Sequence, residues 1–254
     1  VRSRGLGDVY KRQDLPDFNP DDEYLQEIKS PIFYAVQKNI NIQTGQPTIL
    51  DFDMQRISQR INIVFNIRTE GNIKREDLAA PIIELSGACG RFNIADACLD
   101  TTRLYRMAHQ VQPDEFTQTG EGTYRCVVHF HTLGVIPSAA KGHLNGPGIL
   151  QVALQVSTPQ LDSSGAPVVD EEGNPVKNSR YIYGAINPYD ELTAAQLIEV
   201  RDGKIYLRYS KEDVNIEITT PLVIKADQIV PNDTGMGWQP HDPTNPDDDI
   251  IIEI

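Results

Sequence analysis

The chain has 254 residues, enough for one large β domain or two ordinary domains with a buried core. Its composition, 39% hydrophobic and 23% charged, is typical of folded rather than disordered proteins. The net charge of −13 disfavours nucleic acid and anionic lipid as partners, and no apolar run reaches the roughly 18 residues that cross a bilayer.

The first thirteen residues differ in charge from the rest of the chain. Residues 5–13 resemble the peptide produced when a sequencing adapter is translated at the edge of an assembled metagenomic fragment, and residues 1–13 carry four basic residues against one acidic residue. We interpret residues 1–13 as a non-native artefact and expect the natural N-terminus, with any export or lipid-attachment signal, to be missing. The Pro- and Asp-rich stretch that follows predicts that residues 14–42 are a linker and the remnant of a truncated N-terminal domain.

Strand patterns dominate the next part of the chain. Short β-branched and aromatic runs at 32–38 and 48–54 predict two strands. Residues 56–68 alternate between apolar and polar side chains, which predicts a long strand with one buried face. The apolar side chains on that face are Ile57, Ile61, Ile63, Phe65 and Ile67.

The middle of the chain continues the β pattern after one helical interruption. Residues 73–80 predict a short helix that ends at Pro81, and strands are expected at 82–86 and 103–111. Residues 123–133 alternate again. Their inward side chains are expected to be Cys126, Val128 and Phe130, and their outward ones Val127, His129 and His131.

The second half predicts a hairpin, a helix and further strands. Residues 148–157 and 180–186 predict a hairpin across a long Gly- and Pro-rich turn. Residues 189–200 predict a helix with Asp190 as its N-cap. Two further strands are expected, at 204–209 and 214–218. Residues 43–231 are therefore predicted to form an all-β domain with one or two short helices.

Residues 232–254 change character again. They combine prolines, glycines and aspartates without any Lys or Arg, a composition that does not fold by itself, yet they end in a β-branched run. We interpret this segment as an acidic linker followed by a terminal strand that pairs with a sheet edge, in its own domain or in a neighbour. Ile250, Ile252 and Ile254 share one face of such a strand and are the predicted binding residues.

Few residues indicate chemistry. His129 and His131 share one face of a strand, and His109 or His143 is a candidate third ligand for zinc, but exposed strand histidines without a metal are much commoner. We therefore predict no metal site. The motifs of serine hydrolases, dinucleotide-binding proteins and P-loop proteins are absent or incomplete, so we predict no catalytic residues, no cofactor and no enzymatic activity. The three cysteines are expected to be free thiols.

Aromatic side chains offer a different functional interpretation. Trp238 lies in the acidic segment, and Tyr181, Tyr183 and Tyr189 lie close together in the sequence. Exposed aromatic rings stack on sugars, so these residues raise the hypothesis of a glycan-binding protein. The simpler interpretation, that Trp238 packs the tail onto the domain, is favoured.

Several stretches in a fixed order resemble a known family. They are Ser30–Ala35, Phe52–Arg56 with the alternating strand to Arg68, Phe130–Ala140, Ile149–Val156, Val214–Ile218 and Gly235–Trp238 with the closing Ile-rich run. Together they resemble the fimbrillin-associated anchor and accessory lipoproteins of Bacteroidales fimbriae, the type V pilus system. The resemblance covers most of residues 30–254, with a polar insertion at 162–177 and with the N-terminal domain of that family absent or truncated.

The resemblance implies a transthyretin-like, Greek-key β-sandwich exported as a lipoprotein to the outer membrane. It also implies a non-catalytic structural subunit, an anchor or accessory component of a cell-surface fimbria, that joins other fimbrial subunits by β-strand exchange. Host or bacterial surface ligands are further expected partners. The alternative function is that of a surface glycan-binding β-sandwich lipoprotein.

Overall fold

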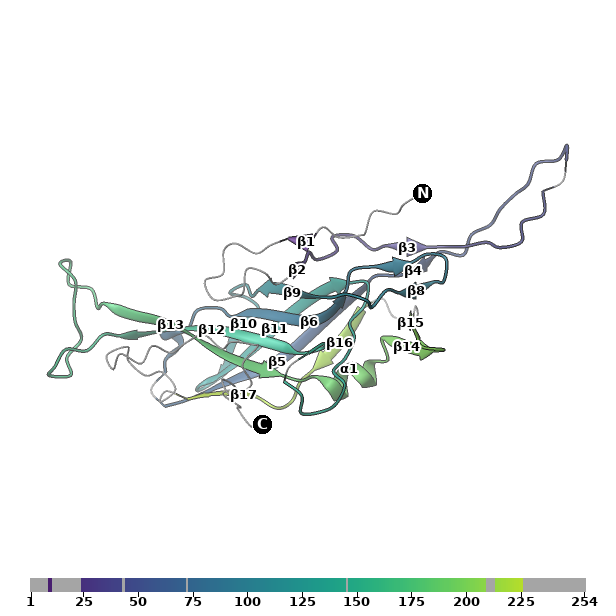
Figure 1. The fold of residues 1–254 in the computed structure, drawn as a ribbon. Helices are drawn as coiled ribbons and strands as arrows, with labels where there is room; N and C mark the ends of the chain where they lie inside the picture. The colour runs from purple at the N-terminus through teal and green to yellow at the C-terminus, as the bar shows by residue number, and fades with distance from the viewer. Residues whose placement is uncertain are drawn as a thin grey trace.

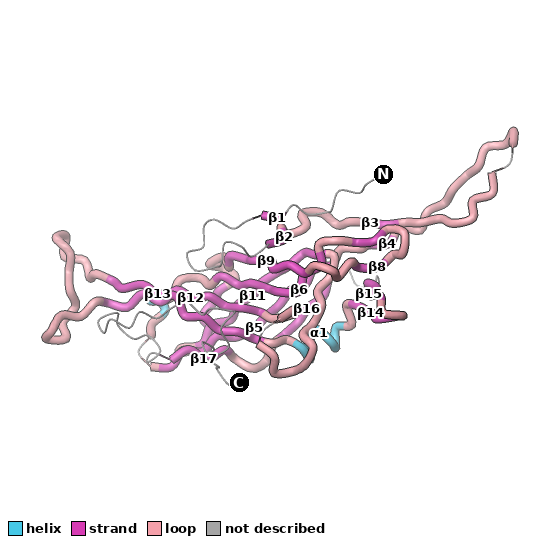
Figure 2. Tube along the Cα trace, in the orientation of Figure 1, coloured by secondary structure: helices cyan, strands magenta, loops and turns pink. Residues whose placement is uncertain are grey.

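The computed structural model describes residues 9–10, 24–42, 44–71, 73–144, 146–208 and 213–225 (Figures 1 and 2). Strands dominate this part of the chain, with one α-helix, α1 (Tyr189–Ala195), and one 3-10 helix, η1 (Arg75–Asp77). The prediction of an all-β sandwich with one or two short helices is confirmed. Among the described residues, no helix is long and apolar enough to span a membrane.

The larger sheet has six strands. Adjacent strands are antiparallel except for the second and third, which are parallel. In spatial order the strands are β1 (Val9–Tyr10), β2 (Tyr24–Leu25), β9 (Leu104–Gln110), β6 (Ile82–Cys89), β12 (Leu150–Pro159) and β13 (Lys177–Ile186). Part of residues 14–42, predicted to be a linker and domain remnant, is therefore continuous with the sandwich.

The second sheet is built around one long strand, β5 (Gln59–Glu70). On one side β5 pairs antiparallel with β11 (Thr123–Thr132), which pairs in turn with β10 (Phe116–Gly120). On the other side β5 pairs in parallel with two short strands in succession, β16 (Asp213–Glu217) and β17 (Leu222–Lys225). The described chain thus ends along the edge of this sheet.

The main core lies between the two sheets. On β5 the side chains of Ile61, Ile63, Phe65 and Ile67 are fully buried, and on β11 those of Cys126, Val128 and Phe130 are as well. Strand β12 contributes Leu150, Val152, Leu154 and Val156 from the opposite sheet. The period-two patterns therefore predicted the inward faces of β5 and β11 correctly, because a strand sends alternate side chains to opposite faces.

The chain passes between the sheets in a Greek-key manner. It leaves β9, enters the other sheet at β10, forms the β10–β11 hairpin, and returns as β12 beside β6. Strands β12 and β13 then form the expected hairpin, from Leu150 opposite Ile186 to Pro159 opposite Lys177. The two consecutive hairpins, β10–β11 and β12–β13, therefore lie in different sheets, on opposite sides of the core.

A small four-stranded sheet closes one end of the sandwich. Its strands are β14 (Ile198–Arg201), β15 (Lys204–Leu207), β8 (Cys98–Leu99) and β7 (Phe92–Asn93). A second, smaller hydrophobic cluster forms between this sheet and the sandwich, from Ile57, Cys89, Leu99, Leu133 and Leu207. A two-stranded ladder of β3 (Phe33–Tyr34) and β4 (Gln55–Arg56) lies beside it.

The predicted helix at 189–200 is shorter than expected. It ends at Ala195 because Gln196 takes the left-handed conformation, with φ of 50°, and the chain then enters β14. The N-cap is Pro188, not Asp190, which lies inside the helix. Helical spacing in this segment is overridden by tertiary structure, because Leu197 is buried and Ile198 pairs with Leu207 in the small sheet.

Two other expected elements also differ. The stretch 73–80 forms only the single turn η1, in which the Asp77 carboxylate accepts a hydrogen bond from the Lys74 amide. Residues 48–54, predicted to be a strand, contain no regular strand and are exposed. A sequence rich in β-branched residues pairs into a sheet only where a partner strand lies beside it.

Two glycines allow a close backbone contact in the larger sheet. Gly87 lies in a bulge in the middle of β6, with φ of 82°, and Gly148 precedes β12 with φ of 75°. A Cβ on Gly148 would lie 2.6 Å from the Ser138 amide nitrogen and 2.7 Å from the Pro137 Cα, distances that real Cβ atoms do not adopt. Only glycine fits this position, for both its backbone angle and its space.

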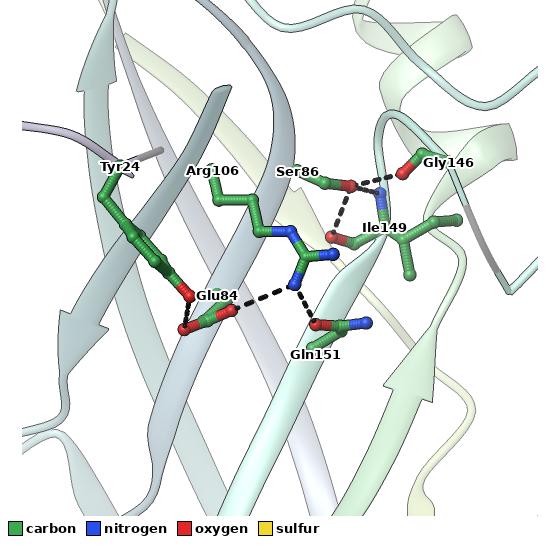
Figure 3. Close-up of polar contacts among 7 residues, drawn as sticks. All are labelled: Tyr24, Glu84, Ser86, Arg106, Gly146, Ile149 and Gln151. Carbon is green, nitrogen blue, oxygen red and sulfur yellow. Dashed lines mark hydrogen bonds and ion pairs between the residues drawn. The ribbon is translucent and has the colours of Figure 1, made fainter. Parts of the chain in front are cut away.

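The serine beside the bulge ties the same segment together. The Ser86 hydroxyl donates a hydrogen bond to the Gly146 carbonyl at 2.6 Å and accepts one from the Ile149 amide at 3.0 Å (Figure 3). The bulge exposes backbone groups that a regular ladder would pair, and Ser86 satisfies two of them. These hydrogen bonds fix the backbone of the loop where it enters β12.

Candidate functional site

A projecting apolar arm is the most conspicuous surface feature of the described chain. We call residues 33–56, which begin with β3 and end with β4, the arm; it extends far from the sandwich (Figure 1). Of the twelve exposed large hydrophobic side chains in the described residues, eight lie on it. These are Phe33, Val36, Ile40, Ile42, Ile49, Leu50, Phe52 and Met54. A group of exposed apolar side chains of this kind is a candidate binding surface.

The base of the arm is held firmly to the body. The Tyr34 hydroxyl donates a hydrogen bond to the Ile94 carbonyl at 2.7 Å, and its ring packs edge-on against Phe92 with centroids 5.3 Å apart. The Ile57 amide donates to the Ile32 carbonyl at 2.8 Å. The arm is therefore presented from a rigid base, while its apolar side chains beyond β3 and β4 face solvent.

Sheet edges determine where a further strand can pair. Within the described residues, no strand other than β12 pairs with β13. The opposite sheet has its edge along β5 covered by β16 and β17. The predicted binding residues Ile250, Ile252 and Ile254, and Trp238, lie outside the described residues, so their pairing stays a prediction.

A cluster of two histidines and one glutamate lies at the margin of the sandwich. His109 Nε2 donates a hydrogen bond to Glu115 Oε2 at 2.9 Å, and His129 Nε2 donates to Glu115 Oε1 at 2.6 Å. The Gln112 amide also donates to Glu115 Oε2, at 2.8 Å. The two imidazole rings lie edge to face, with centroids 5.4 Å apart. One carboxylate thus accepts hydrogen bonds from two rings and one backbone group.

The histidines considered as candidate zinc ligands, His129 with His131 and a third from His109 or His143, do not all lie together in the fold. His131 is buried and hydrogen-bonds Ser58 Oγ at 3.0 Å, whereas His143 is exposed in the loop before β12. The prediction that His131 faces solvent is wrong, because the segment around Ile28 covers it: the Ile28 amide donates to the His131 carbonyl at 2.9 Å. Burial lowers the pKa of His131, and the Arg56 charge adds to this effect.

Sequence reasoning missed Glu115. It lies just before β10, six residues after His109 and fourteen before His129, and no local pattern links the three. They meet because β9 leads from one sheet into the β10–β11 hairpin of the other. A prediction of that crossover from sequence would have been needed to find the cluster.

The environment of Glu115 makes stability depend on pH. Burial raises the pKa of Glu115, but hydrogen bonds from the Gln112 amide and from both imidazoles outweigh it, so the pKa is lowered from its ordinary value of 4.5. As the pH falls, Glu115 is therefore protonated at a higher pH in the unfolded chain than in the folded chain. The stability that this group contributes is complete above pH 4.5 and is lost as the pH falls through the lowered pKa of the folded state.

We therefore expect the free energy of unfolding of Glu115→Gln to fall less steeply below pH 4.5 than that of the wild type. Urea unfolding of the wild type and the variant between pH 3 and pH 7 measures the difference. Glu121→Gln, in the exposed β10–β11 turn, is the matched control and should keep the wild-type slope. Equal slopes in the wild type and Glu115→Gln would show that the cluster contributes nothing to acid sensitivity.

A second polar cluster holds β2 to the larger sheet. Glu84 on β6 is only 1% exposed; its Oε1 accepts a hydrogen bond from the Tyr24 hydroxyl at 2.7 Å, and its Oε2 lies 3.7 Å from the Arg106 guanidinium (Figure 3). Arg106 also donates to Gln151 Oε1 at 3.2 Å. The four residues come from β6, β2, β9 and β12, so this cluster joins four strands. We assign it a structural role.

The cysteines are buried and unpaired. Cys89, Cys98 and Cys126 are all free thiols, as predicted. Burial raises the pKa of Cys89 to about 12, with a smaller contribution from the Asp100 charge, and burial raises that of Cys126 to about 12, with a smaller contribution from Glu115. A thiol in this state is a poor nucleophile, because the thiolate is the reactive form.

Comparisons with known proteins leave the function to be argued from these features. No model of a protein family matches the chain, and no curated protein sequence matches it significantly.

Proposed function

We propose that the chain is a non-catalytic structural subunit of a cell-surface fimbria, an anchor or accessory component that joins its neighbours by pairing of β-strands. The arm is the observation that carries this proposal. In this role the protein is exported to the outer membrane as a lipoprotein, and its main partners are other fimbrial subunits.

The apolar side chains of the arm support a binding role. Ile42 and Ile49 are 77% and 84% exposed. Full burial of one such side chain contributes about 1.5–3 kcal/mol, so eight of them together offer a large driving force for association. An extended apolar segment gains further affinity when its backbone adds to the edge of a neighbouring sheet.

The shape of the molecule supports end-to-end assembly. The arm and the long loop of the β12–β13 hairpin project from opposite ends of the sandwich (Figure 1). In this proposal a strand from a neighbour adds to the edge of β13 that faces away from β12. A subunit that donates a segment at one end and offers an edge elsewhere forms chains rather than closed pairs.

The C-terminal run is a second proposed donor. Ile250, Ile252 and Ile254 alternate with Ile251 and Glu253, so an extended conformation gives the run one apolar face. The acidic, Pro-rich segment before it provides reach. In this proposal the arm and the tail both contribute strand pairing, and the experiment below measures each separately.

The proposal is tested by measuring mass in solution. We expect the full chain to associate with increasing concentration in light scattering, and the double variant Ile42→Ser, Ile49→Ser to remain monomeric with an unchanged melting temperature. Both side chains are exposed, so their replacement changes the free energy of unfolding by less than about 0.5 kcal/mol. Val200→Ser, exposed but outside the arm, is the control and should associate like the wild type.

The other outcomes separate the possible mechanisms. A chain ending at Pro246 that stays monomeric and recaptures an added Ile250–Ile254 peptide would assign assembly to the tail. A full chain that remains monomeric at all concentrations would rule out assembly by either segment.

A second function is favoured by one pair of side chains. Tyr181 and Tyr183 lie on the same face of β13, with nearly parallel rings whose centroids are 6.3 Å apart. Both are partly exposed. A pair of aromatic rings on a sheet surface can stack on neighbouring sugar units, which supports a surface glycan-binding lipoprotein as the alternative. Saturable binding on an oligosaccharide array that is lost in Tyr181→Ala would support this function.

A further inference from the structure

We propose that His109, Glu115 and His129 form a binding site for one divalent metal ion of the zinc class. The inference is independent of the fimbrial proposal, because it concerns residues outside the arm and is measured by metal binding rather than by assembly. It also differs from the sequence analysis, which considered His129 with His131 as candidate zinc ligands and predicted no metal site.

The fold brings the three ligands together from three different segments. His109 lies near the end of β9, Glu115 lies at the start of the β10–β11 hairpin, and His129 lies on β11. The Val127 amide donates to the Glu115 carbonyl at 2.9 Å, which fixes the backbone of Glu115 against β11. Sites built on paired strands hold their ligands more accurately than sites on free loops.

The distances suit a tetrahedral ion. A nitrogen or oxygen atom from each of the three residues lies within 4.8 Å of the other two. In a tetrahedral zinc site with bonds of about 2.0–2.1 Å, neighbouring ligand atoms lie about 3.3 Å apart. The present distances of 2.9 Å and 2.6 Å from the two Nε2 atoms to the carboxylate oxygens therefore need to open by less than about 1 Å.

The chemistry of the ligands selects the class of metal. Two imidazole nitrogens and one carboxylate are preferred by zinc and its transition-metal neighbours, whereas calcium and magnesium take oxygen ligands alone. Three protein ligands leave a fourth tetrahedral position for water. The thiol of Cys126 does not compete for the ion, because it is fully buried and points into the core.

The surroundings favour binding in three further ways. The side chains of His109, Glu115 and His129 are 17%, 15% and 28% exposed, so an ion can reach them from solvent. The hydrogen bond from the Gln112 amide holds the Glu115 carboxylate in place, as outer hydrogen bonds do in known metal sites. The net charge of −13 raises the local concentration of cations.

A direct titration tests the proposal. Zinc chloride is added to the metal-free full chain in a calorimeter at pH 7.5, and we expect one equivalent to bind. His109→Gln and His129→Gln each remove one ligand while keeping a similar side-chain volume. Each should weaken binding by more than about 100-fold, beyond the 10- to 100-fold loss typical of an outer-shell residue. His143→Gln, exposed and remote in sequence, is the control and should bind like the wild type.

A second readout identifies the ligands even if one variant folds poorly. Cobalt(II) added to the wild-type chain should give the visible absorption of a tetrahedral site, and one equivalent of zinc should abolish it.

Three results would overturn the proposal. They are no zinc binding by the wild type, binding that survives in folded His109→Gln and His129→Gln, and a cobalt spectrum typical of octahedral oxygen ligands. The first result would leave the cluster as a hydrogen-bonded ion pair. The assembly experiment is unaffected by any of these results, so failure of one proposal is not failure of the other.

Discussion

Gly148→Ala is expected to lower the free energy of unfolding by about 3 kcal/mol, the sum of backbone strain at positive φ and an overpacked contact. The added Cβ would lie 2.6–2.8 Å from backbone atoms of Ser138 and Pro137. Backbone atoms cannot rotate away as a flexible side chain can, so β12 or the preceding loop must shift. Because β12 pairs with both β6 and β13, a shift there disturbs the centre of the larger sheet.

Gly142→Ala separates the two contributions. Gly142 also has a positive φ, of 93°, but no atom lies within 4 Å of the position that its Cβ would occupy. Alanine at this position should therefore lower stability by only about 1–2 kcal/mol, the strain alone. Urea unfolding of both variants measures the difference. Equal losses would mean that the contact at Gly148 is relieved without cost, contrary to our expectation.

Phe65→Ala is expected to lower the free energy of unfolding by about 3–5 kcal/mol, because it leaves a cavity between the two sheets. Phe65 is fully buried and lies opposite Cys126 in the ladder between β5 and β11. Strand β5 is paired on both edges, so the surrounding backbone has little freedom to collapse into the space.

The matched control for Phe65→Ala lies on the solvent face of the same strand. Arg60→Ala removes an exposed side chain from β5 and should change stability by less than about 0.5 kcal/mol. Thermal and chemical unfolding of the three proteins give the comparison. A loss at Phe65 no larger than that at Arg60 would contradict the assignment of Phe65 to the main core.

The parts of the fold that could be predicted from sequence are those set by local alternation. Strands β5 and β11 have long period-two patterns, because each has one buried face. The prediction of a helix over all of 189–200 was wrong because a distant contact overrides the local pattern. The spacing there is helical, but Ile198 pairs with Leu207, on a strand that follows later in the chain. Residues 48–54 have strand composition but no partner strand, so composition alone was misleading there.

In the candidate sites, too, the local sequence does not predict contacts between distant segments. A strand pattern correctly places His129 on the outer face of β11, but local sequence does not show that the segment around Ile28 covers His131. Glu115 carries no signal of its own, because its meeting with His109 depends on the crossover from β9 to β10. The sequence indicated the arm only as two β-branched and aromatic runs, at 32–38 and 48–54. Their exposure follows from the absence of a covering element among the described residues, which no residue pattern expresses.

The parallel pairing along β5 has a consequence for the order of folding. Asn62 on β5 and Asn215 on β16 are hydrogen-bonded partners separated by 153 positions in the chain, so this edge of the sheet closes only after the residues of β16 have been synthesised. Contacts between such distant segments form late and slowly. Until β16 and β17 pair with it, β5 presents a long edge of unpaired backbone N–H and C=O groups, to which a strand from another molecule can add. The period before β16 and β17 pair with β5 is therefore when a strand from another molecule competes best for this edge.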